Sequence, residues 1–347
     1  MKPHEPEVQT TDPEGKESAP ACPICGEVGR EETGLHPISP FIEGIKFNIV
    51  RCVGCGLFTT DPWPTPDMLH SIHDSGDYYS TIEASMSQVV ERPLIDRLHS
   101  AVRALVIRQH FATGGAGFWG WLASLVGRRR FGWAPRGLPK GGKLLDVGCG
   151  DGVFLLDVRD DGWDVSGLDI SPTAVRNARR LGLNVDLGSV EDHPLEPGGY
   201  DVVRMWSVLE HVPRSDIALD AVLRLLKPGG WLILQVPDVS GFTPRLQGAR
   251  WTGWHVPLHL VHFDRGTLER AIRKSGLMPV EFHSASVGTM IGRYPQFKNM
   301  IGRMAVFLMD QLFDLLGHGD SMIVFARKPF DGETTDWAQA AADASDL

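Results

Sequence analysis

The chain has 347 residues, of which 42% are hydrophobic, and carries a formal net charge of −9. This length suffices for one large domain and a small one, and the net charge excludes a global positive field of the kind that gathers nucleic acid. No apolar run reaches the ~18 residues of a membrane span and the polar N-terminus has no signal peptide, so we expect a cytoplasmic protein whose five cysteines stay reduced.

Two CxxC pairs stand near the start of the chain. Cys22 and Cys25 lie in "CPICG", and Cys52 and Cys55 lie in "CVGCG", so a glycine follows each pair and lets the backbone fold back. Two such turns on facing hairpins predict a closed, structural zinc site with four cysteine ligands, in preference to disulfides or a single redox pair. We therefore expect a zinc ribbon over residues 21–80, with strands supplied by the segment "FIEGIKFNIV".

The region 81–139 predicts a helical linker between this ribbon and a larger domain. Between Arg97 and Lys143 there are nine Lys or Arg, no Asp or Glu, and six interleaved aromatic residues. Two interpretations of the range 97–143 stay open: a solvated helix with a linker, or a peripheral surface that meets anionic lipid or a phosphate-bearing substrate. The polar, Pro-rich residues 1–20 predict a disordered tail, and residues 331–347 form a second tail.

From residue 143 the pattern alternates between strands and helices. An apolar strand carries Asp146 and is followed by Gly148, Gly150 and Gly152. Glycines this dense after a strand predict that the backbone passes close to a ligand. The spacing is GxGxG, which is not the GxGxxG of a dinucleotide-binding fold. The second strand ends at Asp169, where a carboxylate can accept hydrogen bonds from both hydroxyls of a ribose.

These motifs resemble the class I S-adenosylmethionine-dependent methyltransferases. The resemblance rests on "LLDVGCGDG", "GLDIS", "YDVVRMWSVLEHV" and "LLKPGGWLILQVPD", which occur in the family's order and spacing within residues 140–330. It implies an α/β fold, a Rossmann-like doubly wound sheet of seven strands with the last strand antiparallel. The cysteine motifs resemble the zinc ribbon that precedes this domain in a subgroup linked to sugars, glycolipids and secondary metabolites.

The resemblance also implies how S-adenosylmethionine is bound. Many relatives have an acid where Ser189 stands, so Glu191 is expected to supply the contact to the adenine amino group. Along the chain, the implied contacts are to the amino-acid end (Asp146, Gly148, Gly150 and Gly152), the ribose hydroxyls (Asp169), the adenine (Ile170, Ser189, Val190 and Glu191) and the methyl-transfer centre (Met205, Trp206 and Ser207).

Histidines are the candidates for a general base, because methyl transfer to a hydroxyl or an acidic carbon is helped by a group that titrates near neutrality. His211 follows the fourth strand in "LEHV", and it either fixes its turn or lies near the substrate. The stretch "WHVPLHLVHF" places His255, His259 and His262 on the acceptor side of the cofactor. We expect His259 to be the base or a substrate ligand, with His255 second, and His262 to pack beside the helix cap Asp264.

The sequence argues against a metal ion among these histidines. Pro257 interrupts any helix that would align His255 with His259, and the four-cysteine site is already complete. Some members of the family hold a divalent metal with the Glu and His of the "EH" motif and an acid three residues before the Glu. This chain has Ser207 at that position, which favours metal-independent transfer.

Residues 288–318 separate the last two expected strands. This connection is longer than the short hairpin that joins them in the simplest version of this fold. Apolar residues recur there at helical spacing. Two interpretations stay open: an extra helix packed on the core, or a cap over the substrate or a patch that touches lipid.

We predict methyl transfer to oxygen or carbon of a small-molecule acceptor, a sugar, lipid or secondary-metabolite intermediate. An RNA methyltransferase is the second hypothesis, but the stretch from Cys22 to Cys55 contains only Arg30, Lys46 and Arg51 as cations, so no nucleic-acid partner is expected. The third hypothesis is a non-catalytic cofactor-binding scaffold, which burial of the acceptor-side histidines would favour.

Overall fold

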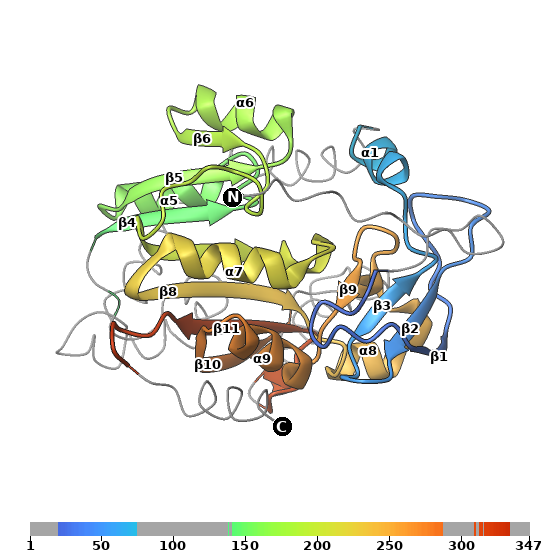
Figure 1. The fold of residues 1–347 in the computed structure, drawn as a ribbon. Helices are drawn as coiled ribbons and strands as arrows, with labels where there is room; N and C mark the ends of the chain where they lie inside the picture. The colour runs from blue at the N-terminus through green and yellow to red at the C-terminus, as the bar shows by residue number, and fades with distance from the viewer. Residues whose placement is uncertain are drawn as a thin grey trace, which may run out of the picture.

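The structure is a computed structural model that describes residues 20–74, 138, 141–286, 309, 312–314 and 316–333. Within these ranges the chain forms a seven-stranded sheet and a four-stranded sheet, with helices on both faces of the larger one (Figure 1). Nearly all of the expected linker, of the expected insertion at 288–318 and of both tails lies outside the described residues.

The larger sheet has the strand order β10-β11-β8-β7-β4-β5-β6 (Figure 1). Neighbouring strands are parallel except at β11, which runs antiparallel to both β8 and β10. This arrangement confirms the predicted Rossmann-like sheet with an antiparallel last strand. The strands are β4 (Lys143–Val147), β5 (Asp164–Asp169), β6 (Asn184–Leu187), β7 (Tyr200–Trp206), β8 (Leu226–Pro237), β10 (Met278–Ala285) and β11 (Ser321–Arg327).

Successive residues of the central strands face opposite sides of the sheet and bury into separate apolar clusters. Leu145 and Val203 join the cluster that contains α7 and α9, whereas Leu144 and Val202 join the cluster that contains α5 and α6. Helices therefore cover both faces of the larger sheet, which is why the sequences of its central strands are continuous apolar runs. The helices are α5 (Val153–Asp160), α6 (Pro172–Arg180), α7 (Ser215–Leu225), α8 (Phe242–Gln247) and α9 (Arg265–Lys274).

Local sequence signals fix where these helices begin. Ser171 caps α6 by accepting a hydrogen bond from the backbone N–H of Ala174, and a proline follows it at the first helical position. Asp264 caps α9 and forms a reciprocal capping box with Thr267, as the sequence predicts for Asp264. Short 3-10 helices lie in the loops after β7 and β8, at η1 (Leu209–His211), η2 (Gly248–Arg250) and η3 (Thr252–Trp254).

The smaller sheet is antiparallel, and its fourth strand comes from a distant part of the chain. Its strands are β1 (Arg30–Leu35), β2 (Asn48–Cys52), β3 (Phe58–Asp61) and β9 (Val261–His262), and α1 (Pro66–Asp74) follows β3. The segment expected to supply the ribbon strands contributes only its last three residues, to β2. Residues 41–47 of that segment form no strand, and Gly44 within it has a positive φ of 84°, which extended strand backbone does not use.

The ribbon packs directly on the larger domain. Cys22, Ile24 and Leu57 belong to the same buried cluster as the inward faces of α7 and α9. Two cations on α9 extend this contact: Arg270 donates a hydrogen bond to the backbone oxygen of Cys55 (2.7 Å) and Lys274 donates one to that of Ile24 (2.8 Å). The described parts of both sheets therefore share one core. No helix in the described ranges is long and apolar enough to cross a membrane.

Candidate active site

The turn after β4 is shaped by glycines in the left-handed region of backbone space. Gly148, Gly150 and Gly152 have φ values of 70°, 54° and 78°. A Cβ atom would lie 2.4 Å from Val208 at Gly148 and 2.3 Å from Leu183 at Gly152, whereas at Gly150 no atom of the described residues lies within 4 Å. Gly148 and Gly152 are thus required by packing, and Gly150 faces a space that a ligand can fill.

Asp169, at the end of β5, braces this turn. Its carboxylate accepts hydrogen bonds from the backbone N–H groups of Gly150 and Ser171, both at 2.8 Å. A carboxylate offers about four acceptor positions, so these bonds are compatible with additional bonds to the hydroxyls of a ribose. The next residue, Ile170, is 62% exposed and presents an apolar surface beside the carboxylate. These features fit the nucleoside of S-adenosylmethionine.

Asp146 is buried and paired with a cation that the sequence analysis did not single out. Arg204, its neighbour on β7, places one guanidinium nitrogen 2.8 Å from the carboxylate. Burial raises the pKa of Asp146, and the charge of Arg204 acts against that shift. The guanidinium also stacks on the rings of Phe154 (3.8 Å) and Trp206 (4.6 Å). An arginine inside the apolar strand "YDVVRMW" was the signal that could have revealed it.

The other expected cofactor contacts fall in different environments. Ser189 donates a hydrogen bond to Asp192 (3.2 Å), and burial raises the pKa of the half-buried Glu191. Val190 and Met205 are buried in the core, and Trp206 is half-buried beside Arg204. Their roles toward the cofactor stay predictions.

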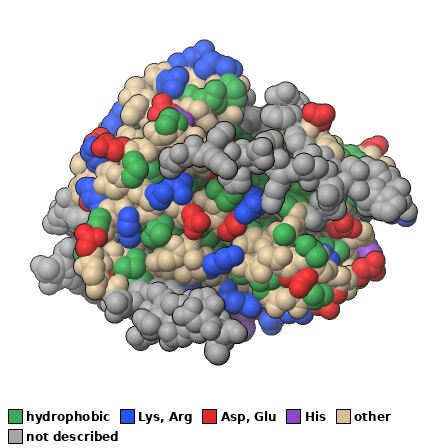
Figure 2. Space-filling view, in the orientation of Figure 1, with side chains coloured by type: hydrophobic (Ala, Val, Ile, Leu, Met, Phe, Trp, Pro, Cys, Tyr) green, Lys and Arg blue, Asp and Glu red, His purple; other side chains and the backbone are tan. Residues whose placement is uncertain are grey.

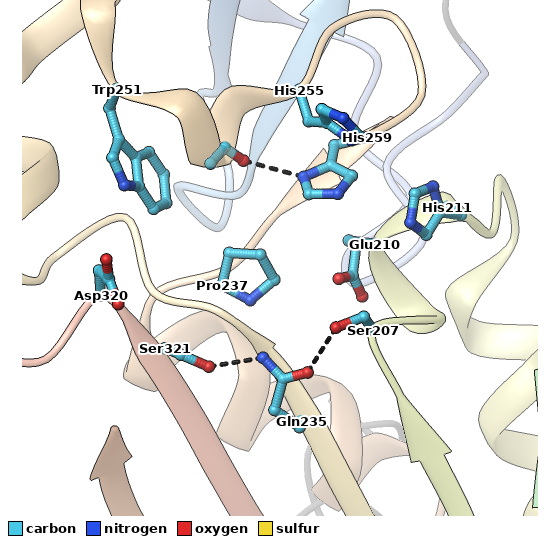
Figure 3. A pocket seen from close by; sticks show the side chains of 11 residues that line it. Ser207, Glu210, His211, Gln235, Pro237, Trp251, His255, His259, Asp320 and Ser321 are labelled. Atoms are coloured by element: carbon cyan, nitrogen blue, oxygen red, sulfur yellow. Dashed lines mark hydrogen bonds between the residues drawn. The ribbon is translucent and has the colours of Figure 1, made fainter. Parts of the chain in front are cut away.

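A cavity of about 260 Å³ opens beyond the carboxyl ends of β7 and β8 (Figure 3). This is where such sheets bind ligands. The three predicted catalytic histidines, His211, His255 and His259, all line it. Its floor is held by a hydrogen-bonded chain in which Ser207 donates to Gln235 (2.6 Å) and Gln235 donates to Ser321.

His259 is 8% exposed and is held in one tautomer. Its Nδ1 lies 2.8 Å from the backbone oxygen of Gly253, and because a carbonyl only accepts, Nδ1 carries the proton and Nε2 carries the lone pair. His211 makes the same arrangement with the backbone oxygen of Leu258 (2.9 Å), and the two rings meet edge to face at 4.7 Å. Burial, aided by the neighbouring histidines, lowers the pKa of His259 well below its ordinary value.

Glu210 was not among the predicted site residues and entered the sequence analysis only as the Glu of the "EH" motif. Its side chain is 1% exposed, and neither carboxylate oxygen has a hydrogen-bond partner among the described residues. Burial raises the pKa of Glu210 to about 8. Together with His211 and His259 it lines the cavity (Figure 3), although "LEHV" gave no sign that this acid would be buried.

The other two histidines have different surroundings. His255 has a positive φ of 43° and contacts the rings of Phe41 (4.9 Å) and His259 (5.0 Å). His262 is buried in β9, where its Nε2 lies 3.0 Å from the hydroxyl of Thr60 in the ribbon. Burial, with a smaller contribution from His211, lowers the pKa of His262 to about 3.

The four ribbon cysteines come together as predicted. All their sulfur atoms lie within 4.8 Å of one another, with Cys22 3.4 Å from Cys55 and Cys25 3.5 Å from Cys52, and none forms a disulfide. A tetrahedral zinc ion with bonds of about 2.3 Å requires sulfur separations of about 3.8 Å. The glycines after the two pairs have φ values of 77° and 82°. This donor set fits a closed zinc site.

A protein-family model described as a methyltransferase domain matches residues 122–281. The chain is 32% identical over 165 residues to a ubiquinone biosynthesis O-methyltransferase of Bordetella bronchiseptica, an alignment that spans 43% of this chain and 68% of the relative. The chain belongs to the S-adenosylmethionine-dependent methyltransferases.

Other relatives align with this methyltransferase over shorter or more divergent stretches. A ubiquinone biosynthesis O-methyltransferase of Thiobacillus denitrificans is 41% identical over 111 residues, 30% of this chain and 48% of the relative. A solved S-adenosylmethionine-dependent methyltransferase of Methanosarcina mazei is 18% identical, with a TM-score of 0.41 over 56% of this chain and 95% of that one. Neither comparison identifies the acceptor of this methyltransferase.

Proposed function

We propose that this methyltransferase transfers a methyl group to an oxygen atom of a small molecule held in the cavity beyond β7 and β8. The observation that carries the proposal is the meeting of Glu210, His211 and His259 at this cavity. The cavity's Ser207 is next in the chain to Val208, which packs against Gly148 of the glycine turn. Two relatives at 41% and 32% identity are named as O-methyltransferases, which supports oxygen over carbon as the acceptor atom.

S-adenosylmethionine supplies an electrophilic methyl group on a sulfonium sulfur. The chain's own residues would hold it beyond the ends of β4 and β5: Asp169 would accept hydrogen bonds from the ribose hydroxyls, and Ile170 would cover the adenine. The turn at Gly150 would lie against the amino-acid end of the cofactor.

His259 would act on the acceptor. Its Nε2 is unprotonated because Nδ1 donates to Gly253, so Nε2 can take the proton of an acceptor hydroxyl as the methyl group is transferred. Burial keeps the ring neutral near pH 7, which keeps the base in its active form. Trp251 and Pro237 supply apolar walls to the cavity beside His259.

The cavity supports a neutral, hydroxylated acceptor of modest size. About 260 Å³ is just below the usual range of about 300–1,000 Å³ for small-molecule sites. Among the described lining residues there is no Lys or Arg to pair with a phosphate. A hydroxylated ring, as in a sugar or a secondary-metabolite intermediate, satisfies both conditions.

The test is a labelled-methyl assay against metabolite extracts, with mass spectrometry of the product. His259→Ala should lower turnover by about 10²–10⁴-fold, the range of general base catalysis, and leave S-adenosylmethionine affinity unchanged. His283→Ala is the matched control, because His283 pairs with Glu281 on β10 and does not line the cavity. Full turnover by His259→Ala, or loss of cofactor affinity instead, would remove His259 from this role.

The two other hypotheses find less support. The burial of His259 favours a non-catalytic scaffold, but His259 lines an open cavity and the chain belongs to an enzyme family.

RNA binding finds no support at the edge of β3, because β9 already pairs with that edge. On the described part of the face in Figure 2, acidic and basic side chains are interspersed, apart from a small basic group over α6. A salt-sensitive RNA gel shift would revive that hypothesis.

A further inference from the structure

The acceptor cavity differs in hydrogen-bonding capacity from one side to the other. His211 and His259 each donate Nδ1–H to a backbone carbonyl, so their Nε2 lone pairs can only accept. Trp251 lies on the other side of the view in Figure 3, with Pro237 between it and His211, and an indole nitrogen can only donate. A ligand that spans the cavity therefore meets acceptors at one side and a donor at the other.

The indole N–H of Trp251 is a buried donor without a partner. Trp251 is 2% exposed, and its Nε1 has no hydrogen-bond partner among the described residues. The equally buried Trp254 shows the usual arrangement, because its Nε1 donates to the backbone oxygen of Gly248 (2.9 Å). An unpaired buried N–H costs free energy, and since Trp251 lines the cavity, an oxygen of a bound ligand can remove this cost.

Gly253 holds the indole of Trp251 and the imidazole of His259 in fixed positions. A Cβ atom on Gly253 would lie 2.2 Å from the indole ring, so only glycine allows this contact. The backbone oxygen of the same Gly253 accepts the hydrogen bond from Nδ1 of His259 (2.8 Å). The donor of Trp251 and the lone pair of His259 are thus positioned relative to each other by one residue.

The ribbon packs against the same indole. Trp251 belongs to a buried apolar cluster with Phe47 and Ile49 of the ribbon and with Trp254 and Val256 of the loop after β8. The rings of Trp251 and Trp254 meet edge to face, with their centroids 5.2 Å apart. Packing of this kind restricts the rotation of the indole, which keeps its N–H from turning toward another partner.

We propose that Trp251 is a specificity-determining residue, whose indole N–H donates a hydrogen bond to an oxygen of the acceptor while the acceptor hydroxyl faces His259. This inference rests on the proposed function and names the substrate class: a hydroxylated ring with a second oxygen that accepts, in a carbonyl or a ring ether. That oxygen is neutral, because the described lining contains Glu210 and Asp320 and no Lys or Arg. A ring without that oxygen leaves the N–H unpaired and binds more weakly.

Nuclear magnetic resonance tests the hydrogen bond directly. The full chain, loaded with zinc and isotope-labelled at tryptophan nitrogen, is titrated with the isomeric hydroxycyclohexanones and with cyclohexanol, which lacks the carbonyl. The indole signal of Trp251 is the one that is missing in Trp251→Phe. We expect this proton signal to move downfield with at least one hydroxycyclohexanone, because it gains a hydrogen bond, and to change little with cyclohexanol. No such shift at tens of millimolar, or an equal shift with cyclohexanol, would overturn the proposal.

Variants connect the hydrogen bond to affinity. Trp251→Phe keeps an apolar ring and removes the N–H, so it should weaken binding of the hydroxycyclohexanone by about 2–10-fold, the loss of one neutral hydrogen bond, and leave the affinity for cyclohexanol unchanged. Trp254→Phe is the matched control, because Trp254 donates to Gly248 and is not among the described residues that line the cavity. Equal weakening of both ligands in Trp251→Phe would show that only the shape of the ring matters and would refute the proposal.

His259→Ala separates this proposal from the proposed function. The shift does not require methyl transfer, so the Trp251 signal should still move in His259→Ala. A shift in a chain that transfers no methyl group would support the role of Trp251 while the proposed function fails. Methyl transfer that depends on His259, without any shift at Trp251, would keep the proposed function and refute the role of Trp251.

Discussion

Asp169 joins the two parts of the cofactor site, since it braces the backbone at Gly150 and is the residue expected to hold the ribose. Asp169→Ala removes a charged acceptor whose hydrogen bonds each contribute about 1.5–3 kcal/mol. We expect the affinity for S-adenosylmethionine to fall at least tenfold in isothermal titration calorimetry. Asp160→Ala, an exposed acid at the end of α5, is the control that should keep full affinity. Unchanged binding by Asp169→Ala would refute the assignment.

The residues of the site divide into those that a linear pattern can reveal and those that it cannot. The glycine turn and Asp169 are visible because both follow strands whose apolar runs identify them. Glu210 is different, since its importance comes from burial next to His259, a residue 49 positions later. A sequence shows an acid beside a histidine but not that both its oxygens are removed from water. Arg204 is intermediate, because a cation within an apolar strand is visible but its partner is not.

At the scale of elements, the pairing of β3 with β9 links the ribbon to the acceptor loop. The hydroxyl of Thr60 donates to the backbone oxygen of His259 (2.7 Å) and lies 3.0 Å from Nε2 of His262. The backbone N–H of Thr60 donates to the oxygen of Leu260. Thr60 is therefore a positioning residue that acts through the histidine loop.

Replacing Thr60 should disturb the acceptor and spare the cofactor. Thr60→Val keeps the shape and leaves two buried polar partners unsatisfied, at about 1–3 kcal/mol each. We expect a higher KM for the acceptor or a lower kcat, with unchanged S-adenosylmethionine affinity and recovery in Thr60→Ser. Thr59→Val is the matched control, because the buried hydroxyl of Thr59 has no partner among the described residues. Equal kinetics in both valine variants would contradict the positioning role.

Most elements of the larger domain were predictable, because their apolar runs are long and bounded by clear signals. β4, β5, α9 and β11 occur where the sequence predicted them. The ribbon was harder, since three of its strands have only four to six residues and the fourth, β9, is a two-residue segment about 200 residues away. Such pairing depends on how the two parts dock, which local periodicity does not encode.

At the scale of the whole molecule, zinc should stabilise more than the ribbon. The ribbon's Cys22, Ile24 and Leu57 share a core with α7 and α9, so loss of the ion loosens packing on the larger domain. We expect one zinc per chain by metal analysis, and a melting temperature at least about 5 °C lower after chelation, since each kcal/mol shifts it by a few degrees. A well-folded chain without zinc, or an unchanged melting temperature after chelation, would contradict this.

Acid should destabilise the molecule through His262. Burial lowers its pKa from 6.5 to about 3, so between these values the unfolded chain binds a proton that the folded chain does not. The contribution of His262 to stability is thus complete above pH 6.5 and is lost as the pH falls toward 3, by up to about 1.4 kcal/mol per pH unit.

Urea unfolding at pH 7 and pH 5 measures this loss. The variant His262→Gln cannot titrate and keeps a polar atom near Thr60, so its free energy of unfolding should fall less between the two pH values. An equal pH slope in the variant and the unaltered chain would show that His262 does not titrate as its burial predicts.

The strand pair β3–β9 also constrains the order of events during synthesis. At about 5–20 residues per second, the ~200 residues between the two strands take roughly 10–40 s to emerge from the ribosome. During that interval β3 is an open sheet edge, the kind of edge at which chains aggregate. The ribbon therefore finishes its sheet only when the acceptor loop arrives, and a nascent chain that stops short of β9 has neither a closed ribbon nor an acceptor site.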